Sequence, residues 1–144
     1  MPANPNFKED LEAFVLRMPI VQFLQLSFGT VEHGMVEISI PYRDELSFAP
    51  GTLQAGPIGM LMDIAGCCAV GTRLPAGWAF ATIDSSVKVL APATGELFLA
   101  RGLAVSSGKT VSVGEAKVFA VRDGRETLCA TGLVTTRNFK LESS

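Results

Sequence analysis

The sequence predicts an α+β domain in which a curved antiparallel sheet of about six strands wraps around one long helix. Residues 57–70 are almost all small or apolar, and a helix that is apolar on most faces must be surrounded by other elements. Residues 79–139 divide into strand-like segments joined by short polar turns, which is typical of an antiparallel meander. The 144 residues suffice for one core, so we assign residues 1–144 to a single domain.

The elements before the apolar helix are short. Apolar residues at helical spacing predict an amphipathic helix over residues 6–18, capped by Asn6 and ended by Pro19. A period of two over residues 26–41 predicts two strands that turn near His33 and Gly34. The polar segment 43–52 contains Pro50 and Gly51, which indicates a loop.

The apolar helix is expected to begin with Pro57 at its first position, where proline loses no hydrogen bond, and to end at Gly71. Four strands are expected to follow, over residues 79–92, 95–106, 109–122 and 126–139. Their connecting turns contain glycine, and Asp123-Gly124 is a strong hairpin signal. Sheets of this kind leave edges that proteins cover or pair, so we expect two copies to pair edge to edge as a dimer.

The charge excludes a broadly basic nucleic-acid-binding protein, because the net charge is -2. Residues 1–84 hold four basic and nine acidic residues, whereas residues 85–144 hold eight basic and five acidic residues. The basic half is either a set of solvated strand faces or a set of cations placed for a phosphate-bearing ligand.

Cysteine usage and the N-terminus indicate the compartment. The three cysteines are odd in number and two are adjacent, which argues against a disulfide framework and fits a reducing environment. The first residues lack the basic start and apolar stretch of a signal peptide. The apolar run at residues 57–70 is too short to span a bilayer, so we expect a cytoplasmic protein with no membrane partner.

Asp63 lies in the middle of the apolar helix, and burying an unpaired carboxylate is costly. Asp63 is therefore either a structural residue bonded to a hydroxyl or to the backbone, or a general base or nucleophile. His33 is the only histidine and lies in a turn, so the sequence offers no metal site.

The stretch LQAGPIGMLMDIAG resembles the hotdog-fold thioesterases of the phenylacetate-pathway (PaaI-like) and 4-hydroxybenzoyl-CoA thioesterase group. Their motif is spaced as H-G-G-x-x-x-x-L-x-D, and its positions are occupied here by Gln54, Ala55, Gly56, Leu61 and Asp63. The segments ATIDSSVKVLAPATGELFLARG, SGKTVSVGEAKVF and RDGRETLCATGLVTTRNF are similar to later strands of that group. The likeness covers residues 20–139.

The sequence departs from the motif at three positions. Gln54 stands in place of the histidine, and Ala55 in place of the first glycine. Phe48 stands where an asparagine or glutamine often precedes the acid.

The resemblance implies an enzyme, an acyl-CoA thioesterase that hydrolyses an acyl- or aryl-CoA thioester to the free acid and coenzyme A, with no cofactor. It implies that Asp63 acts as base or nucleophile and that the Ala55 N–H stabilises the oxyanion beside Gln54 and Gly56. Thr82 would help to hold the water. The expected substrate-binding residues are Phe48, Met60, Met62 and Cys67 for the acyl group, and Gly108, Lys109 and Arg137 for the phosphates of coenzyme A.

The helix geometry indicates that this site is shared between two chains. Ala55 and Asp63 lie eight residues apart, or about 12 Å of helical rise, so one carbonyl cannot contact both in one chain. The resembled family builds its site across a dimer interface, and a dimer or a dimer of dimers is expected. Two other functions remain open: a non-catalytic acyl-CoA or acyl-lipid binding protein, favoured by Gln54 and Phe48, and an interaction module without a ligand.

Overall fold

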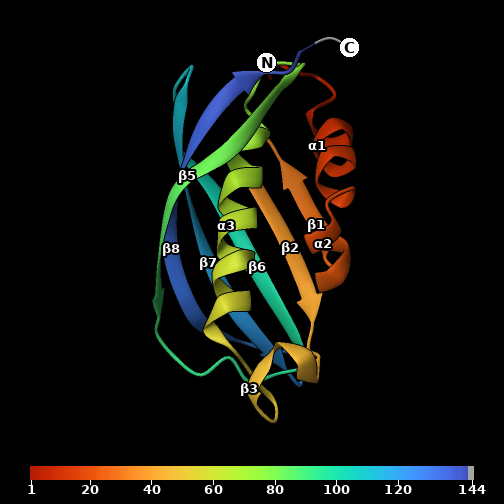
Figure 1. The fold of residues 1–144 in the computed structure, drawn as a ribbon, viewed down its shortest axis with the longest axis vertical. Coiled ribbons are helices and arrows are strands. Elements are labelled where there is room, and N and C mark those ends of the chain that lie inside the picture. The colour runs from red at the N-terminus through yellow and green to blue at the C-terminus, as the bar shows by residue number, and fades with distance from the viewer. Residues whose placement is uncertain (143–144) are drawn as a thin grey trace.

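The computed structural model describes residues 1–142, and one antiparallel sheet curves around a central helix (Figure 1). The sheet has six strands in the order β1-β2-β6-β7-β8-β5. Its strands are β1 (Ser27–Glu32), β2 (Met35–Pro41), β5 (Trp78–Val89), β6 (Leu97–Ser107), β7 (Val111–Arg122) and β8 (Arg125–Lys140). The other elements are α1 (Phe7–Leu16), α2 (Pro19–Leu24), the 3-10 helix η1 (Asp44–Leu46), β3 (Ser47–Ala49), β4 (Thr52–Leu53) and α3 (Ala55–Gly71). The predicted α+β fold class is confirmed.

The predicted meander is right for β6, β7 and β8 but wrong for β5. β5 pairs with β8 at one edge of the sheet, while β6 lies between β2 and β7. Residues 93–95 are therefore part of a crossing connection, which Leu53 holds by donating its N–H to the Ala93 carbonyl at 2.9 Å. A short polar turn signal does not distinguish a hairpin from such a crossing, because it reports only local conformation.

The N-terminal helix is shorter than predicted. α1 ends at Leu16, and Pro19 begins the second helix, α2, instead of ending the first. Proline is favoured at that first position because its missing N–H would be unpaired there in any case. Asn6 occupies the cap position of α1, but its side chain makes no capping hydrogen bond.

The central helix α3 begins at Ala55, two residues before the predicted start, so Pro57 is its third residue. Gln54 is the N-cap, and its side-chain oxygen accepts a hydrogen bond from the Gly56 N–H. The helix ends at Gly71 as predicted. Thr72, just past this end, accepts from the Gly34 N–H at 2.7 Å, which fixes the helix end to the β1–β2 turn.

The helix lies directly on the backbone of the sheet. A Cβ built on Gly102 would lie 2.0 Å from the Ala65 carbonyl oxygen, and one on Gly114 would lie 2.4 Å from the Gly66 carbonyl oxygen. Only glycine permits this approach, and it fixes the height of α3 above β6 and β7. The position of every side chain on α3, including Asp63, follows from it.

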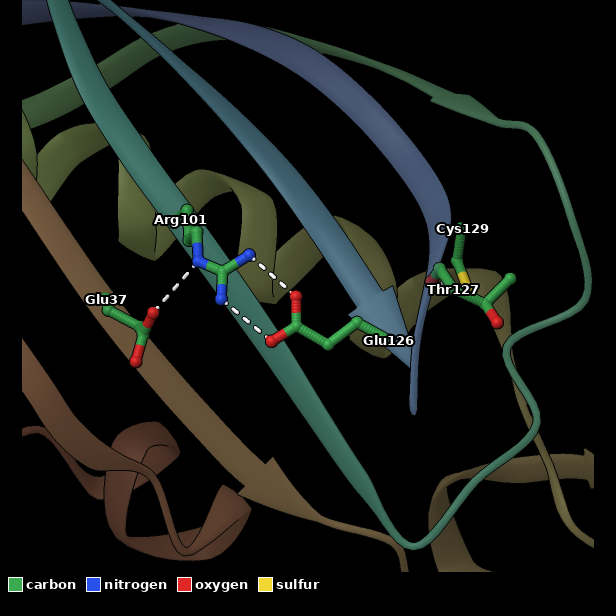
Figure 2. Close-up of polar contacts among 5 residues, drawn as sticks. All are labelled: Glu37, Arg101, Glu126, Thr127 and Cys129. Atoms are coloured by element: carbon green, nitrogen blue, oxygen red, sulfur yellow. Dashed lines mark hydrogen bonds and ion pairs between the residues drawn. The ribbon is translucent and has the colours of Figure 1, made fainter. Parts of the chain in front are cut away.

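The face of the sheet away from α3 carries an ion-pair cluster (Figure 2). Arg101 on β6 bonds Glu37 of β2 at 2.9 Å and Glu126 of β8 through two bonds of 2.8 Å. The Arg101 guanidinium lowers the pKa of the Glu126 carboxyl by hydrogen bonding and charge. Because these three side chains are 27–40% exposed, the cluster contributes little to stability.

Candidate active site

Asp63 lies midway along α3 and faces β5. Thr82 donates its hydroxyl to Asp63 Oδ1 at 2.8 Å, and the Cys67 thiol approaches the same oxygen at 3.8 Å. The Cys67 sulfur and the Thr82 hydroxyl are themselves 3.3 Å apart. One carboxylate oxygen is thus fixed by two side chains, and no donor among residues 1–142 contacts the other oxygen, Oδ2.

Local structure explains why these three side chains meet. Cys67 follows Asp63 by one helical turn, so both lie on one face of α3. Thr82 pairs across the sheet with Thr136, which is fully buried beneath α3, so both side chains point toward the helix. The register of β5 shifts between Thr82 and Asp84, and such bulges often re-aim side chains beside active sites.

Cys67 is a hydrogen-bond donor here and not a nucleophile. Burial, together with the nearby Asp63 charge, raises the pKa of the Cys67 thiol to about 12. The thiol is therefore protonated at neutral pH, whereas a nucleophilic cysteine needs a thiolate.

A cavity of about 190 Å³ opens beside Asp63. Apolar side chains from α1, from the loop after it, from α3 and from β5 make up most of its walls. The lining residues are Val15, Met18, Asp63, Ile64, Cys67, Cys68, Phe80, Ala81 and Thr82. Val15 is buried whereas Ala81 and Thr82 are exposed, so the cavity runs from solvent at β5 toward α1.

A second cavity, of about 390 Å³, lies at the N-terminus of α3. Phe48, Gln54 and Ala55 line it together with residues of the crossing connection, so the structure brings these three predicted site residues together. The Gly56 N–H is taken by Gln54, and the Ala55 N–H has no partner among the described residues. A free N–H at a helix N-terminus can stabilise developing negative charge.

These two groups of residues do not meet within one chain. Asp63, Cys67 and Thr82 line one cavity, and Phe48, Gln54 and Ala55 line the other. Asp63 comes eight residues after Ala55, or about 12 Å along the helix axis.

The remaining predicted substrate-binding residues are scattered. Met62 is completely buried in the core, and Met60 is half-buried against it. Arg137 is exposed between two buried neighbours on β8, so it points to the face of the sheet away from α3. Gly108 and Lys109 line a cavity of about 300 Å³ near the C-terminal end of α3.

Arg73 is a residue that sequence reasoning missed. It lines the same cavity as Lys109, and its guanidinium lies 3.4 Å from the Ser107 hydroxyl. One signal could have identified it, since Arg73 is the only basic residue between positions 44 and 84. Together Arg73 and Lys109 form a cationic cavity.

Two negative findings concern residues 1–142. No cluster of three or more His, Cys, Asp or Glu side chains in this range is arranged to hold a metal ion. No helix in this range combines the length and apolar character needed to cross a bilayer.

Several solved structures are similar to this chain. A thioesterase family protein from Silicibacter pomeroyi superposes with a TM-score of 0.90 at 30% identity, over 93% of this chain and 98% of that one. A protein of the thioesterase superfamily superposes with a TM-score of 0.79 at 28% identity, over 92% of this chain and 98% of that one. A thioesterase from Haemophilus influenzae superposes with a TM-score of 0.80 at 18% identity, over 94% of this chain and 92% of that one. This likeness shows that the two proteins share a fold. Models of protein families give no match, and curated protein sequences give none.

The architecture defines the class of protein. A long helix enclosed by a curved six-stranded antiparallel sheet is the hotdog fold of the thioesterase superfamily, as the resemblance predicted. The likeness to the Silicibacter protein spans nearly all of both chains, and this chain belongs to the thioesterase family. That membership supports a thioesterase-type function at the level of the superfamily.

Proposed function

We propose that this chain is an acyl-CoA thioesterase that hydrolyses an acyl- or aryl-CoA thioester to the free acid and coenzyme A. The observation that carries the proposal is the Asp63 carboxylate, which Thr82 holds by one oxygen in a mainly apolar cavity. The other oxygen is left to accept a proton from water or to attack a carbonyl. Leaving one carboxylate oxygen without a donor in a mainly apolar cavity costs free energy. Catalysis gives a reason for that cost, whereas a purely structural role does not.

The proposed reaction needs only water and the thioester. Asp63 takes a proton from a water molecule while the water oxygen attacks the carbonyl carbon, or Asp63 attacks the carbon itself and water opens the resulting anhydride. In the first route the carbon–sulfur bond breaks after water has attacked, and the sulfur leaves as a thiol with the proton that Asp63 took from the water. In the second route the carbon–sulfur bond breaks as the anhydride forms, and the thiolate that leaves takes up the proton released when water opens the anhydride. Negative charge develops on the carbonyl oxygen, and we assign the Ala55 N–H as its donor.

The Ala55 donor comes from a second copy of the chain in this proposal. β5 is an edge strand of 12 residues, and three large apolar side chains at this edge are 49–56% exposed: Ile83, Val89 and Leu90. A long apolar edge invites pairing with another strand. Pairing two β5 edges about a two-fold axis sets the α3 helices antiparallel, so Ala55 of each copy approaches Asp63 of the other. The assembly is a dimer or a dimer of dimers.

The phosphates of coenzyme A are assigned to the cationic cavity formed by Arg73 and Lys109. The Ser107 hydroxyl beside Arg73 offers a further donor. Anionic groups bind where guanidinium and ammonium groups meet hydroxyl donors.

The test is a thiol-release assay with short, long and aromatic acyl-CoAs. Asp63→Asn keeps the shape of the side chain but removes the base, so turnover should fall by about 10²–10⁴-fold. The matched control is Asp123→Asn, the same substitution in an exposed hairpin turn, which should turn over normally. Near wild-type hydrolysis by Asp63→Asn, with the fold intact by circular dichroism, would exclude this mechanism.

Gln54 supports a second candidate, a non-catalytic acyl-CoA or acyl-lipid binding protein. Its amide oxygen occupies the Gly56 N–H and leaves one free donor at the helix start. A rise in melting temperature with acyl-CoA, without any release of thiol, would favour this candidate. Steady release of thiol by the wild type would exclude it.

A further inference from the structure

Phe80 separates the Asp63 cavity from a larger one. It lines the Asp63 cavity of about 190 Å³ and also a cavity of about 390 Å³ beneath α1. The larger cavity is lined by Phe14, Leu74 and Trp78 among others. The Phe80 ring therefore stands as a wall between two spaces whose other lining residues all differ.

This wall is held on two sides. The Phe14 ring meets the Phe80 ring edge to face, with centroids 5.7 Å apart. On another side Phe80 packs on the end of α3, where a Cβ on Gly71 would lie 2.6 Å from its ring and 3.0 Å from Leu11. Glycine at position 71 thus admits the ring, and α1 braces it.

The Asp63 cavity has the chemistry of an acyl pocket. From the reacting carbonyl, the acyl side needs apolar walls, whereas the coenzyme side needs an opening to solvent for a large polar carrier. Val15, Met18 and Ile64 supply apolar walls toward α1, and Thr82 lies at the exposed side. The acyl group therefore points toward Phe80.

We propose that Phe80, braced by Phe14, is the end wall of the acyl pocket and limits the substrate to a compact acyl group about the size of one aromatic ring. This rests on the proposed function. An apolar cavity of roughly 150 Å³ accommodates benzene, so about 190 Å³ holds a ring or a short branched chain. A long fatty acyl chain does not fit unless the wall is removed.

Removing the wall joins the two cavities and changes the preferred chain length. Beyond Phe80 the larger cavity offers apolar surface from Leu11, Leu74 and Ala79. Each methylene buried there improves transition-state binding by about fourfold. Phe80→Ala should therefore raise the ratio of kcat/KM for dodecanoyl-CoA to that for hexanoyl-CoA by at least about tenfold.

The experiment measures this ratio in five proteins. Phe80→Ala should raise the ratio most, and Phe80→Leu and Phe14→Leu should raise it less. The two leucine variants keep the test valid if the alanine variant does not fold. The control is Phe28→Leu, which removes the same ring from another half-buried site that lines neither cavity and should leave the ratio unchanged. The wild type should prefer phenylacetyl-CoA and hexanoyl-CoA to dodecanoyl-CoA.

A binding measurement separates this inference from the proposed function. Non-hydrolysable S-hexyl-CoA and S-dodecyl-CoA are titrated into the wild type and each variant. If no acyl-CoA is hydrolysed but the affinity ratio shifts in the Phe80 variants, the proposed function fails and the wall stands. The wall is refuted if hydrolysis depends on Asp63 but neither the kcat/KM ratio nor the affinity ratio shifts in the folded Phe80 and Phe14 variants. It is also refuted if the wild type already prefers dodecanoyl-CoA.

Discussion

At the scale of single residues, Thr82 decides how Asp63 is presented. Its hydroxyl makes the shorter of the two contacts to Oδ1, at 2.8 Å against 3.8 Å for the Cys67 thiol, so it is the main group that orients the carboxylate. In the proposed mechanism Thr82 is therefore a positioning residue that acts through Asp63.

Thr82→Val keeps the shape of the side chain but removes this donor. A hydrogen bond to a charged group contributes about 1.5–3 kcal/mol when buried, and Thr82 is exposed, so we expect kcat to fall about tenfold with little change in KM. Thr82→Ser, which keeps the hydroxyl, should restore most of the rate. A valine variant with wild-type kcat would contradict the positioning role.

The raised pKa of Cys67 gives a prediction about pH. A thiol whose pKa is about 12 in the folded protein stays protonated as pH rises past 9.0, where an unperturbed thiol ionises. Because only the thiolate reacts, iodoacetamide at pH 8.5 should modify Cys67 at least about 100-fold more slowly in the folded protein than in urea. Mass spectrometry of the modified peptide measures both rates. Rapid modification of the folded protein would contradict this.

At the scale of elements, the close contact between α3 and the sheet determines where the site lies. Gly114 and Gly102 let the helix backbone rest on β7 and β6, and no wider residue fits beneath the carbonyl oxygens of α3. The site is therefore sensitive to changes on the opposite side of the helix from Asp63.

Gly114→Ala tests this contact. The added methyl group would lie 2.4 Å from the Gly66 oxygen, so the helix must move, and such overpacking costs typically about 1–3 kcal/mol. Urea unfolding should show this loss, and thiol release should fall as well. The control is Gly29→Ala on β1, whose methyl group would meet only the flexible Glu37 side chain and should leave the free energy of unfolding nearly unchanged. Equal effects of the two changes on unfolding would contradict the argument.

The sequence was sufficient to predict the central helix and the six strands of the main sheet, but it missed α2 and the short elements η1, β3 and β4 and did not give all strand partners. The α3 helix and the strands β6 to β8 follow local patterns, and Asp63 is conspicuous because its neighbours are apolar. The pairing of β5 with β8 depends on contacts between distant segments, which periodicity does not report. The Phe14–Phe80 wall was not predicted for the same reason, since each residue alone is an ordinary apolar residue.

At the scale of the whole molecule, the free β5 edge and the split site have one explanation. A single chain holds the carboxylate in one cavity and the free N–H in another. Two chains paired at β5 would complete two sites at once, each with Asp63 from one copy and Ala55 from the other. Activity would then require the dimer.

Mixing two inactive variants tests this directly. Asp63→Asn removes the base, and Ala55→Pro removes the N–H while proline remains acceptable at the first helical position after Gln54, whose ψ of 154° is extended. Each variant alone should be inactive. After subunit exchange, half of the dimers are mixed and each holds one intact site, so about a quarter of wild-type activity should return.

The double variant Asp63→Asn/Ala55→Pro, mixed with wild type, is the decisive control. If the site is shared, one site of each mixed dimer lacks the N–H and the other lacks the base, so mixed dimers are inactive. After equal amounts are mixed, only the quarter of dimers that are wild type in both chains stay active, so about a quarter of wild-type activity per total protein remains. If each chain held a complete site, the wild-type chain in each mixed dimer would stay active, and half of the activity would remain. The two single variants mixed with each other would then stay inactive. The thiol-release assay distinguishes these outcomes because each arrangement predicts a different pair of values.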